Sequence, residues 1–129
     1  TKGRLIIPSK FREELGEEFV VTKGLDGCLF VFPNEAWQEF ENKLRSLPLA
    51  NKSARQFSRF FVAGASSCEL DKQGRILLPS SLREFAGLEK EVVLTGMLEI
   101  WSKEKWLENN SYDDMDEIAE QMMDLGLSI

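Results

Sequence analysis

The amino-acid sequence predicts an α+β protein in which two pseudo-symmetric copies of one split β-α-β unit interlock. Three observations support this prediction: a repeat within the chain, short apolar runs that alternate with amphipathic segments, and enough length for one core. The 129 residues are 43% hydrophobic and 29% charged, as in ordinary globular proteins. A chain of this size needs no disulfide bonds, and its two cysteines, Cys28 and Cys68, are expected to be buried thiols.

The repeat is the most informative feature. Residues 1–16 align without gaps with residues 72–87, and seven of the sixteen positions are identical. The identical pairs are Gly3/Gly74, Arg4/Arg75, Pro8/Pro79, Ser9/Ser80, Arg12/Arg83, Glu13/Glu84 and Gly16/Gly87. Two further blocks continue the similarity, pairing residues 19–24 with 91–96 and residues 28–37 with 97–106. One such unit cannot cover its own sheet, so the two copies are expected to pack together.

Each copy begins with a glycine turn, a strand and a short helix. In the first copy the apolar run Leu5–Ile7 is bounded like a strand. Pro8 ends this strand, Ser9 is expected to cap a two-turn helix, and Gly16 suits the end of that helix. The second copy repeats the pattern at Ile76–Leu78, Pro79, Ser80 and Gly87.

Each copy then continues with two strands and another helix. In the first copy the β-rich runs Phe19–Thr22 and Cys28–Phe32 flank a glycine-containing hairpin loop, and Asn34 can open a helix. The second copy repeats this with Val92–Thr95, Leu98–Trp101 and Ser102. The unit is therefore β-α-β-β-α.

Between and after the copies, helical segments are expected. Ala36–Leu47 and Lys52–Val62 have apolar residues at helical spacing, and a strand around Ser67–Leu70 follows them. Beyond Tyr112, residues 113–125 predict an amphipathic helix that packs on its own subunit or on a neighbour. The predicted divisions are a first repeat (1–47), a helical connection (48–66), a second repeat (67–107) and an acidic amphipathic C-terminal helix (108–129).

The alignment of the copies also shows where they differ. No aspartate equivalent to Asp71 precedes the first copy, which starts at Thr1, and no strand there corresponds to Ser67–Leu70. The loop at Gly96–Met97 is shorter than its counterpart in the first copy. We therefore expect the natural chain to have a further strand before Thr1 and further residues near this loop.

Charge is segregated along the chain. The net charge of −6 argues against a nucleic-acid partner, but residues 108–129 hold seven acidic residues and no basic one. The rest of the chain has 16 basic residues against 15 acidic ones, and neither residues 1–12 nor residues 42–68 contain an acid. The basic stretches fit either a nucleic-acid surface or solvated and inter-subunit helix faces.

These motifs together resemble the MraZ family, which is related to AbrB-like swapped-hairpin DNA-binding proteins. The resemblance rests on the duplicated G-R-[LI]-x-[LI]-P-S-x-[FL]-R-E unit, the D-x-x-x-R motif at Asp71–Arg75, and the segments Arg55–Ala65 and Ile100–Trp106. It covers residues 1–107. It implies a small AbrB/MraZ-like barrel with flanking helices, and a cytoplasmic, nucleoid-associated transcriptional regulator of the bacterial division and cell-wall gene cluster. That regulator would be a ring-shaped homo-oligomer that binds repeated short boxes in double-stranded promoter DNA.

The two basic turns are the candidate DNA contacts. Lysine can neutralise phosphate, and arginine offers a two-pronged donor to guanine or phosphate. Asp71 could pair with the arginine four residues later and orient it, while Gly3 and Gly74 permit a close backbone approach. The candidate contacts are Lys2, Arg4, Lys72, Gln73 and Arg75. The alternative role for the charged pair is a salt bridge that stabilises the fold.

Other chemistry is not indicated. The chain has no histidine and no convergent nucleophile–base pair, so we expect neither an enzyme nor a cofactor, metal or small-molecule substrate. The acids of Glu13–Glu18 fit a solvated helix face, and the tryptophans and phenylalanines fit the core or subunit contacts. No apolar run is long enough to span a membrane. The alternative function is a structural or antitoxin-like oligomeric module that binds a protein partner.

Overall fold

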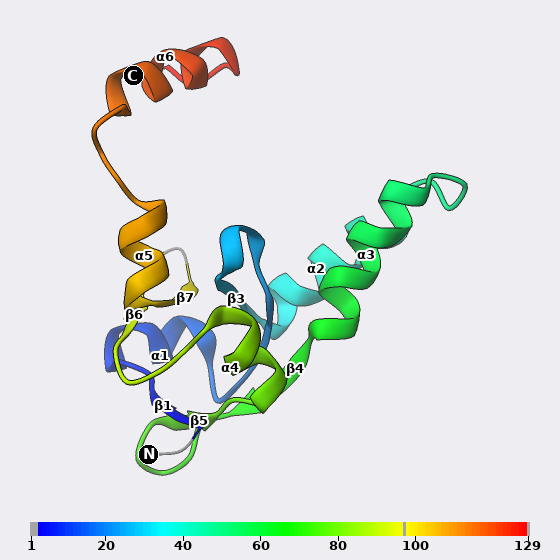
Figure 1. Cartoon of the computed structure of the whole chain (residues 1–129). Helices are drawn as coiled ribbons and strands as arrows, with labels where there is room; N and C mark the ends of the chain where they lie inside the picture. The colour runs from blue at the N-terminus through cyan, green and yellow to red at the C-terminus, as the bar shows by residue number, and fades with distance from the viewer. Residues whose placement is uncertain (1–2, 97, 129) are drawn as a thin grey trace.

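The computed structural model describes residues 3–96 and 98–128 and is α+β (Figure 1). The first copy comprises β1 (Arg4–Ile6), α1 (Ser9–Leu15), β2 (Glu18–Lys23), a short turn at Leu25–Gly27, β3 (Leu29–Pro33) and α2 (Asn34–Arg45). The connection comprises α3 (Lys52–Gly64). The second copy comprises β4 (Ser66–Glu69), β5 (Arg75–Leu77), α4 (Ser80–Ala86), β6 (Val92–Leu94), β7 (Glu99–Ser102) and α5 (Lys103–Asn109), and α6 (Met115–Asp124) follows it. The predicted elements are present, with boundaries shifted by a few residues.

The strands form two antiparallel sheets. One has five strands in the order β4-β2-β3-β7-β6, and the other is a ribbon of β1 and β5 alone. In the described part of the chain the short strands of the ribbon pair only with each other, so no hydrogen-bonded edge joins the ribbon to the larger sheet. The small closed barrel that was expected is therefore not confirmed, although the α+β class is.

The two copies interlock about a pseudo-twofold axis. In the ribbon Leu5 pairs with Ile76, its own equivalent in the repeat. The flanking bonds repeat each other: the N–H of Ile7 donates to the carbonyl of Gly74 over 2.9 Å, and the N–H of Leu78 donates to the carbonyl of Gly3 over 2.8 Å. Strands β3 and β7 cross-pair in the same manner in the larger sheet. In both sheets a strand of one copy thus pairs with the corresponding strand of the other.

Equivalent positions of the two copies fill one core. The apolar faces of α1 and α4 and the inner side of the ribbon pack on the five-stranded sheet. The buried equivalents are Ile7 and Leu78, Phe11 and Leu82, Leu15 and Ala86, and Val31 and Ile100. Burying one large apolar side chain stabilises a fold by about 1.5–3 kcal/mol. The core therefore holds both copies in one unit.

The helix starts differ from the prediction in one respect. Ser9 was expected to cap α1, but Pro8 occupies the cap position and its carbonyl accepts the N–H of Phe11 over 3.0 Å. The second copy does the same. By contrast, the Ser102 hydroxyl caps α5 and accepts the N–H of Lys105 over 3.1 Å. The Pro8 carbonyl accepts one of the N–H groups in the first turn, and no side-chain cap bond is made there.

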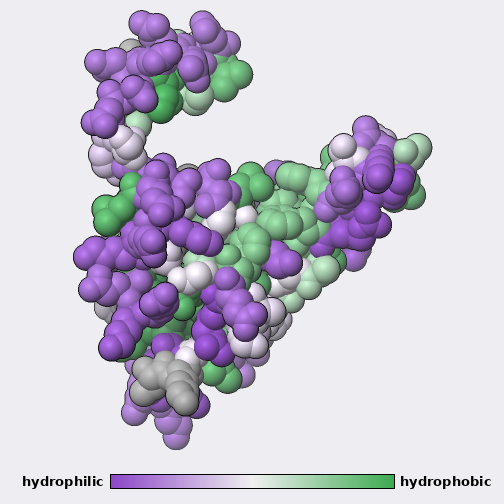
Figure 2. All heavy atoms as spheres, viewed as in Figure 1, coloured by the Kyte–Doolittle hydropathy of each residue, from purple (hydrophilic) through white to green (hydrophobic). Residues whose placement is uncertain are grey.

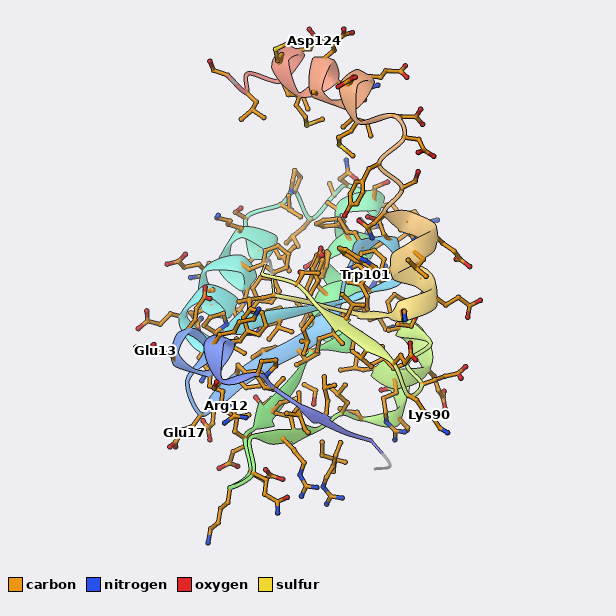
Figure 3. The ribbon with its side chains drawn as sticks, turned by 90° about the vertical axis from the view of Figure 1, so that its left-hand side faces the viewer. Arg12, Glu13, Glu17, Lys90, Trp101 and Asp124 are labelled. Carbon is orange, nitrogen blue, oxygen red and sulfur yellow. The ribbon has the colours of Figure 1, made fainter. Side chains whose placement is uncertain are left out.

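Helices α2 and α3 form an antiparallel hairpin that covers β2 and β3 at its base and projects from the body at its tip (Figure 1). The hydroxyl of Thr22 in β2 donates to the carbonyl of Phe61 in α3 over 2.6 Å. Phe61 and Trp101 are buried among other aromatic rings, in agreement with the predicted core role. Asp124 marks α6, which stands apart from the body (Figure 3). None of the helices in the described residues is long and apolar enough to span a bilayer.

Some expectations fall outside the described residues. These include the contact assigned to Lys2, the strand expected before Thr1 and the position of Met97 in its short loop. The described neighbours of Met97 close the β6–β7 hairpin, since the N–H of Thr95 donates to the carbonyl of Glu99 over 3.1 Å.

Both cysteines are buried, as predicted, so the reactivity of their thiols can test the packing of the core. Burial is the largest cause that raises the pKa of Cys28 from 9.0 to about 12, and it raises the pKa of Cys68 to about 11. For Cys28 this lowers the reactive thiolate fraction near neutral pH by about 1,000-fold. We predict that a thiol reagent at pH 8 modifies the folded protein very slowly and the urea-unfolded protein at both thiols rapidly. Rapid modification of the folded protein would contradict the packing.

Candidate nucleic-acid interface

The outer face of the ribbon carries two arginines and two aliphatic residues. Arg4 and Ile6 of β1 and Arg75 and Leu77 of β5 point outward, while the middle residue of each strand points into the core. Arg4 lies opposite Leu77, and Ile6 lies opposite Arg75. Ile6 and Leu77 are 62% and 59% exposed, which is high for such residues. We call these four residues the ribbon face.

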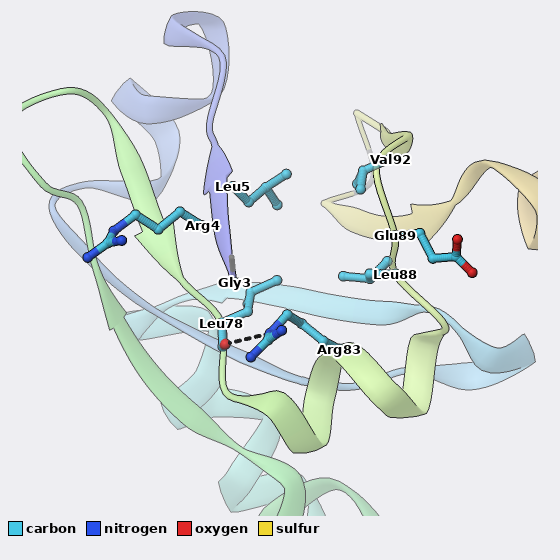
Figure 4. Close-up of a pocket in the computed structure, with 8 residues that line it drawn as sticks. All are labelled: Gly3, Arg4, Leu5, Leu78, Arg83, Leu88, Glu89 and Val92. Atoms are coloured by element: carbon cyan, nitrogen blue, oxygen red, sulfur yellow. Dashed lines mark hydrogen bonds between the residues drawn. The ribbon is translucent and has the colours of Figure 1, made fainter. Parts of the chain in front are cut away.

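The two arginines lie in strands, whereas the sequence predicted them in turns. Gly3 and Gly74 each adopt φ of 76°, a conformation that favours glycine, and the chain becomes extended at the next residue. Each arginine is thus the first residue of its strand. In Figure 4, the Arg4 side chain points away from the other residues drawn. A hydrogen-bonded ladder therefore fixes the backbone of both arginines on one face.

Asp71 pairs with Arg75, as its spacing predicted. One carboxylate oxygen accepts the Arg75 Nε–H over 3.0 Å, and the other accepts the backbone N–H groups of Gln73 and Arg75 over 2.8 and 2.9 Å. The bond from the Arg75 backbone is the largest cause that holds the pKa of Asp71 below its ordinary 3.8. Within the described residues the two Nη atoms of Arg75 have no hydrogen-bond partner. The carboxylate orients the guanidinium and leaves its outer edge available.

The turn before β5 supplies the other predicted contacts. Lys72 and Gln73 are exposed there, directly next to the strand that carries Arg75. The structure thus brings four of the five predicted DNA contacts to one end of the molecule, and the fifth, Lys2, is not described. The acidic helix α6 lies at the opposite end of the body (Figure 1).

Two further arginines hold the ribbon in place, and the sequence analysis missed them. Arg12 Nε–H donates to the carbonyl of Ile7 over 2.7 Å. Arg83 makes the equivalent bond to Leu78 over 3.1 Å (Figure 4). A Cβ atom at Gly3 would lie 3.2 Å from the guanidinium carbon of Arg83, and one at Gly74 would overlap the guanidinium of Arg12.

Each arginine therefore packs against the glycine of the other copy. Gly74 is buried, so the close approach that its lack of a side chain permits is made by Arg12 within the protein. We call this arrangement the arginine–glycine clasp, and it comprises Arg12 with Gly74 and Arg83 with Gly3. The signal that could have found it is the identity of both residue types in the two copies of the repeat.

No group of three or more histidine, cysteine, aspartate or glutamate residues in the part of the chain that is described could hold a metal ion. Glu13 and Glu17 point outward from the body (Figure 3), as a solvated face requires. The ribbon face is therefore the strongest candidate site, and its chemistry is that of binding.

The fold and the ribbon face define a class of protein: a duplicated, interlocked unit that presents a short β-ribbon with two outward arginines. The chain belongs to the MraZ family. The family described as "MraZ protein, putative antitoxin-like" matches it twice, over residues 1–60 and 61–125.

Named relatives agree with this membership. The chain is 64% identical over 130 residues to "Transcriptional regulator MraZ" of Lachnoclostridium phytofermentans, covering 98% of this chain and 91% of that protein. It is 59% identical over 131 residues to the protein of the same name from Thermoanaerobacter sp., covering 98% and 92%. The corresponding protein of Clostridium acetobutylicum is 56% identical over 131 residues, again covering 98% and 92%.

The clasp predicts unequal costs for two glycine substitutions. Gly74 and Gly16 have φ of 76° and 77°, but a Cβ at Gly16 would meet nothing within 4 Å. Gly16→Ala should cost about 1–2 kcal/mol of unfolding free energy from backbone strain alone. Gly74→Ala should cost about 1–3 kcal/mol more because the methyl group displaces Arg12. Urea unfolding at fixed protein concentration measures both.

A second background isolates the clasp itself. In an Arg12→Ala protein, adding Gly74→Ala should lower the free energy of unfolding by no more than Gly16→Ala does in the wild-type protein. Equal costs for the two alanines in the wild-type background would contradict the clasp.

The Asp71 contacts predict a carboxyl titration that NMR can follow. The carboxyl resonance of Asp71 should titrate with a midpoint below 3.8, since its lowered pKa reflects bonds made by the charged form. The stability from these bonds is present above the ordinary pKa and is lost as the pH falls through the lowered one. Arg75→Ala should leave the midpoint below 3.8, because the backbone donors remain. A midpoint at or above 3.8 in the wild-type protein would rule out this set of bonds.

Proposed function

We propose that this protein is a transcriptional regulator that binds double-stranded promoter DNA sequence-specifically through the ribbon face. The observation that carries the proposal is that Arg4 and Arg75 lie on one exposed surface with their backbones held by a β-ladder. The names of the relatives support it, since several are called transcriptional regulators. The proposed setting is the bacterial cytoplasm, with the protein associated with the nucleoid and acting on the division and cell-wall gene cluster.

A two-stranded ribbon suits the major groove. That groove is about 12 Å wide in B-DNA and admits a β-ribbon, as several β-sheet DNA readers show. Arginine can donate two bonds to the O6 and N7 atoms of guanine, and an aliphatic side chain can contact a thymine methyl group. The ribbon face offers two residues of each kind in a pseudo-twofold arrangement. Lys72 lies at its end, where a phosphate contact would fix the register.

Self-association explains how an acidic chain would bind DNA. One ribbon face makes few contacts, so we propose a ring-shaped homo-oligomer whose ribbon faces engage repeated short boxes together. Linked weak sites bind far more tightly than one site because each binding event raises the effective concentration of the next. A head-to-tail contact between the pseudo-equivalent halves would close a ring if its rotation permits.

Replacing both arginines tests the proposal. Arg4→Ala with Arg75→Ala should lower the affinity for a promoter duplex by at least about 30-fold, since each specific arginine contact contributes about 1–3 kcal/mol. Size-exclusion chromatography should show an unchanged assembly, because Arg4 is exposed and the half-buried Arg75 side chain pairs with Asp71 of its own chain. Fluorescence anisotropy at several salt concentrations measures the binding.

The matched control removes the same charge elsewhere. Lys43→Ala with Lys103→Ala leaves the same net charge but alters exposed residues of α2 and α5, and it should change the affinity little. Wild-type affinity should also fall by orders of magnitude between about 50 and 200 mM salt if several phosphates are contacted. Equal binding by the arginine variant and the wild type would remove the ribbon face from the interface and favour a protein-binding module.

A further inference from the structure

The C-terminal helix α6 has an apolar side that covers nothing. Its apolar residues lie on one side of the helix and are drawn in green in Figure 2. They are Met115, Ile118, Ala119, Met122 and Met123. None of the helix's residues is buried, and Ile118 is 38% exposed. An isolated helix of about ten residues is only marginally stable in water, so α6 needs a surface on which to pack.

A groove of matching character runs between α2 and α3. Its apolar floor includes Val62 and Ala63 of α3, and Val62 is 42% exposed. Arg59 of α3 and Arg45 of α2 border this floor. The acid in the lining, Glu41, already pairs with Arg45 over 3.6 Å. The groove therefore combines exposed apolar surface with positive charge.

The two surfaces carry opposite charge. Helix α6 has four acidic residues, Asp116, Glu117, Glu120 and Asp124, and no basic residue. Helix α3 has three basic residues, Lys52, Arg55 and Arg59, and no acidic residue. Helix α2 has two basic residues against three acidic ones, so the positive charge of the hairpin lies on α3. Asp116 borders the apolar side of α6, and the other acids lie on its outer side. Charges of opposite sign within about one Debye length of 8 Å attract even without direct contact.

We propose that α6 of one copy docks its apolar side into the α2–α3 groove of a neighbouring copy. In the single chain the hairpin and α6 project from the body as separate arms (Figure 1). Residues 110–114 link α6 to α5 and leave it free to reach a neighbour. The inference rests on the self-association proposed above and adds the surfaces through which neighbours meet.

This docking has a consequence for charge. The acids of each tail would lie against the basic helix of the next copy and would be neutralised locally, while every copy keeps its net charge of −6. Because α6 lies at the opposite end of the body from the ribbon, the tails would also stay away from DNA. The negative charge of the assembly would then be held away from the ribbon faces, although its total is unchanged.

Disulfide cross-linking between two single variants tests the contact. Val62→Cys and Ile118→Cys chains, one of them with a mass tag, are co-expressed and mildly oxidised. A covalent heterodimer then requires the two residues to meet between copies. Both substitutions lie on exposed sites, and the native cysteines are buried and do not compete. The control pairs Val62→Cys with Glu120→Cys, which places the thiol on the outer side of α6.

We expect at least about fivefold more heterodimer with Ile118→Cys than with Glu120→Cys, because docking holds the first pair at high effective concentration. Equal yields would overturn the inference. So would intramolecular closure of a Val62→Cys, Ile118→Cys double variant as a covalent monomer. A wild-type chain that elutes as a monomer in size-exclusion chromatography would overturn it too. DNA binding by that monomer, and its loss in the Arg4→Ala, Arg75→Ala variant, would separately test the role of the ribbon face.

Discussion

The structure depends on the pairing of β1 with β5, two three-residue strands that lie about seventy positions apart in the chain. The ribbon would not be stable by itself, because an isolated pair of strands is at best marginally stable in water. The core beneath it and the reciprocal arginine–glycine clasp hold it instead. Since the pairing follows a pseudo-twofold axis, the same residue of each copy reaches the same outer face. Duplication thereby doubles the positive charge of one small surface.

This arrangement keeps the acidic and the basic residues of the chain on different parts of the molecule. The chain as a whole is acidic, yet the ribbon carries arginines at one end and the acidic helix lies at the other. Asp71 lies beside Arg75 but leaves it able to bind DNA. The carboxylate accepts bonds from Nε and from two backbone N–H groups, and the outer edge of the guanidinium stays open. The carboxylate thus orients the guanidinium and leaves both Nη groups able to donate.

The repeat predicted most of the fold because most residues that are identical in the two copies mark a local feature, such as a strand end or a helix end. The strand before Pro8, the helix after it and the pairing of Asp71 with Arg75 all follow from neighbouring residues. The helix caps were predicted less well, since Pro8 and Ser9 are both plausible caps and only the backbone geometry decides between them. The clasp could not be derived from spacing, because it joins Arg12 to a glycine of the other copy. Likewise, only the ladder shows that Arg4 and Arg75 share a face.

The most direct test follows the arginine side chains themselves. In a protein labelled with ¹⁵N-arginine, the Nε–Hε signals of Arg4 and Arg75 can be observed while a promoter duplex is added, with Arg45 of α2 as the reference. The account predicts that both ribbon signals shift together along one saturation curve and that the Arg45 signal stays in place. Saturable binding that shifts other arginines and leaves both ribbon signals unmoved would contradict it.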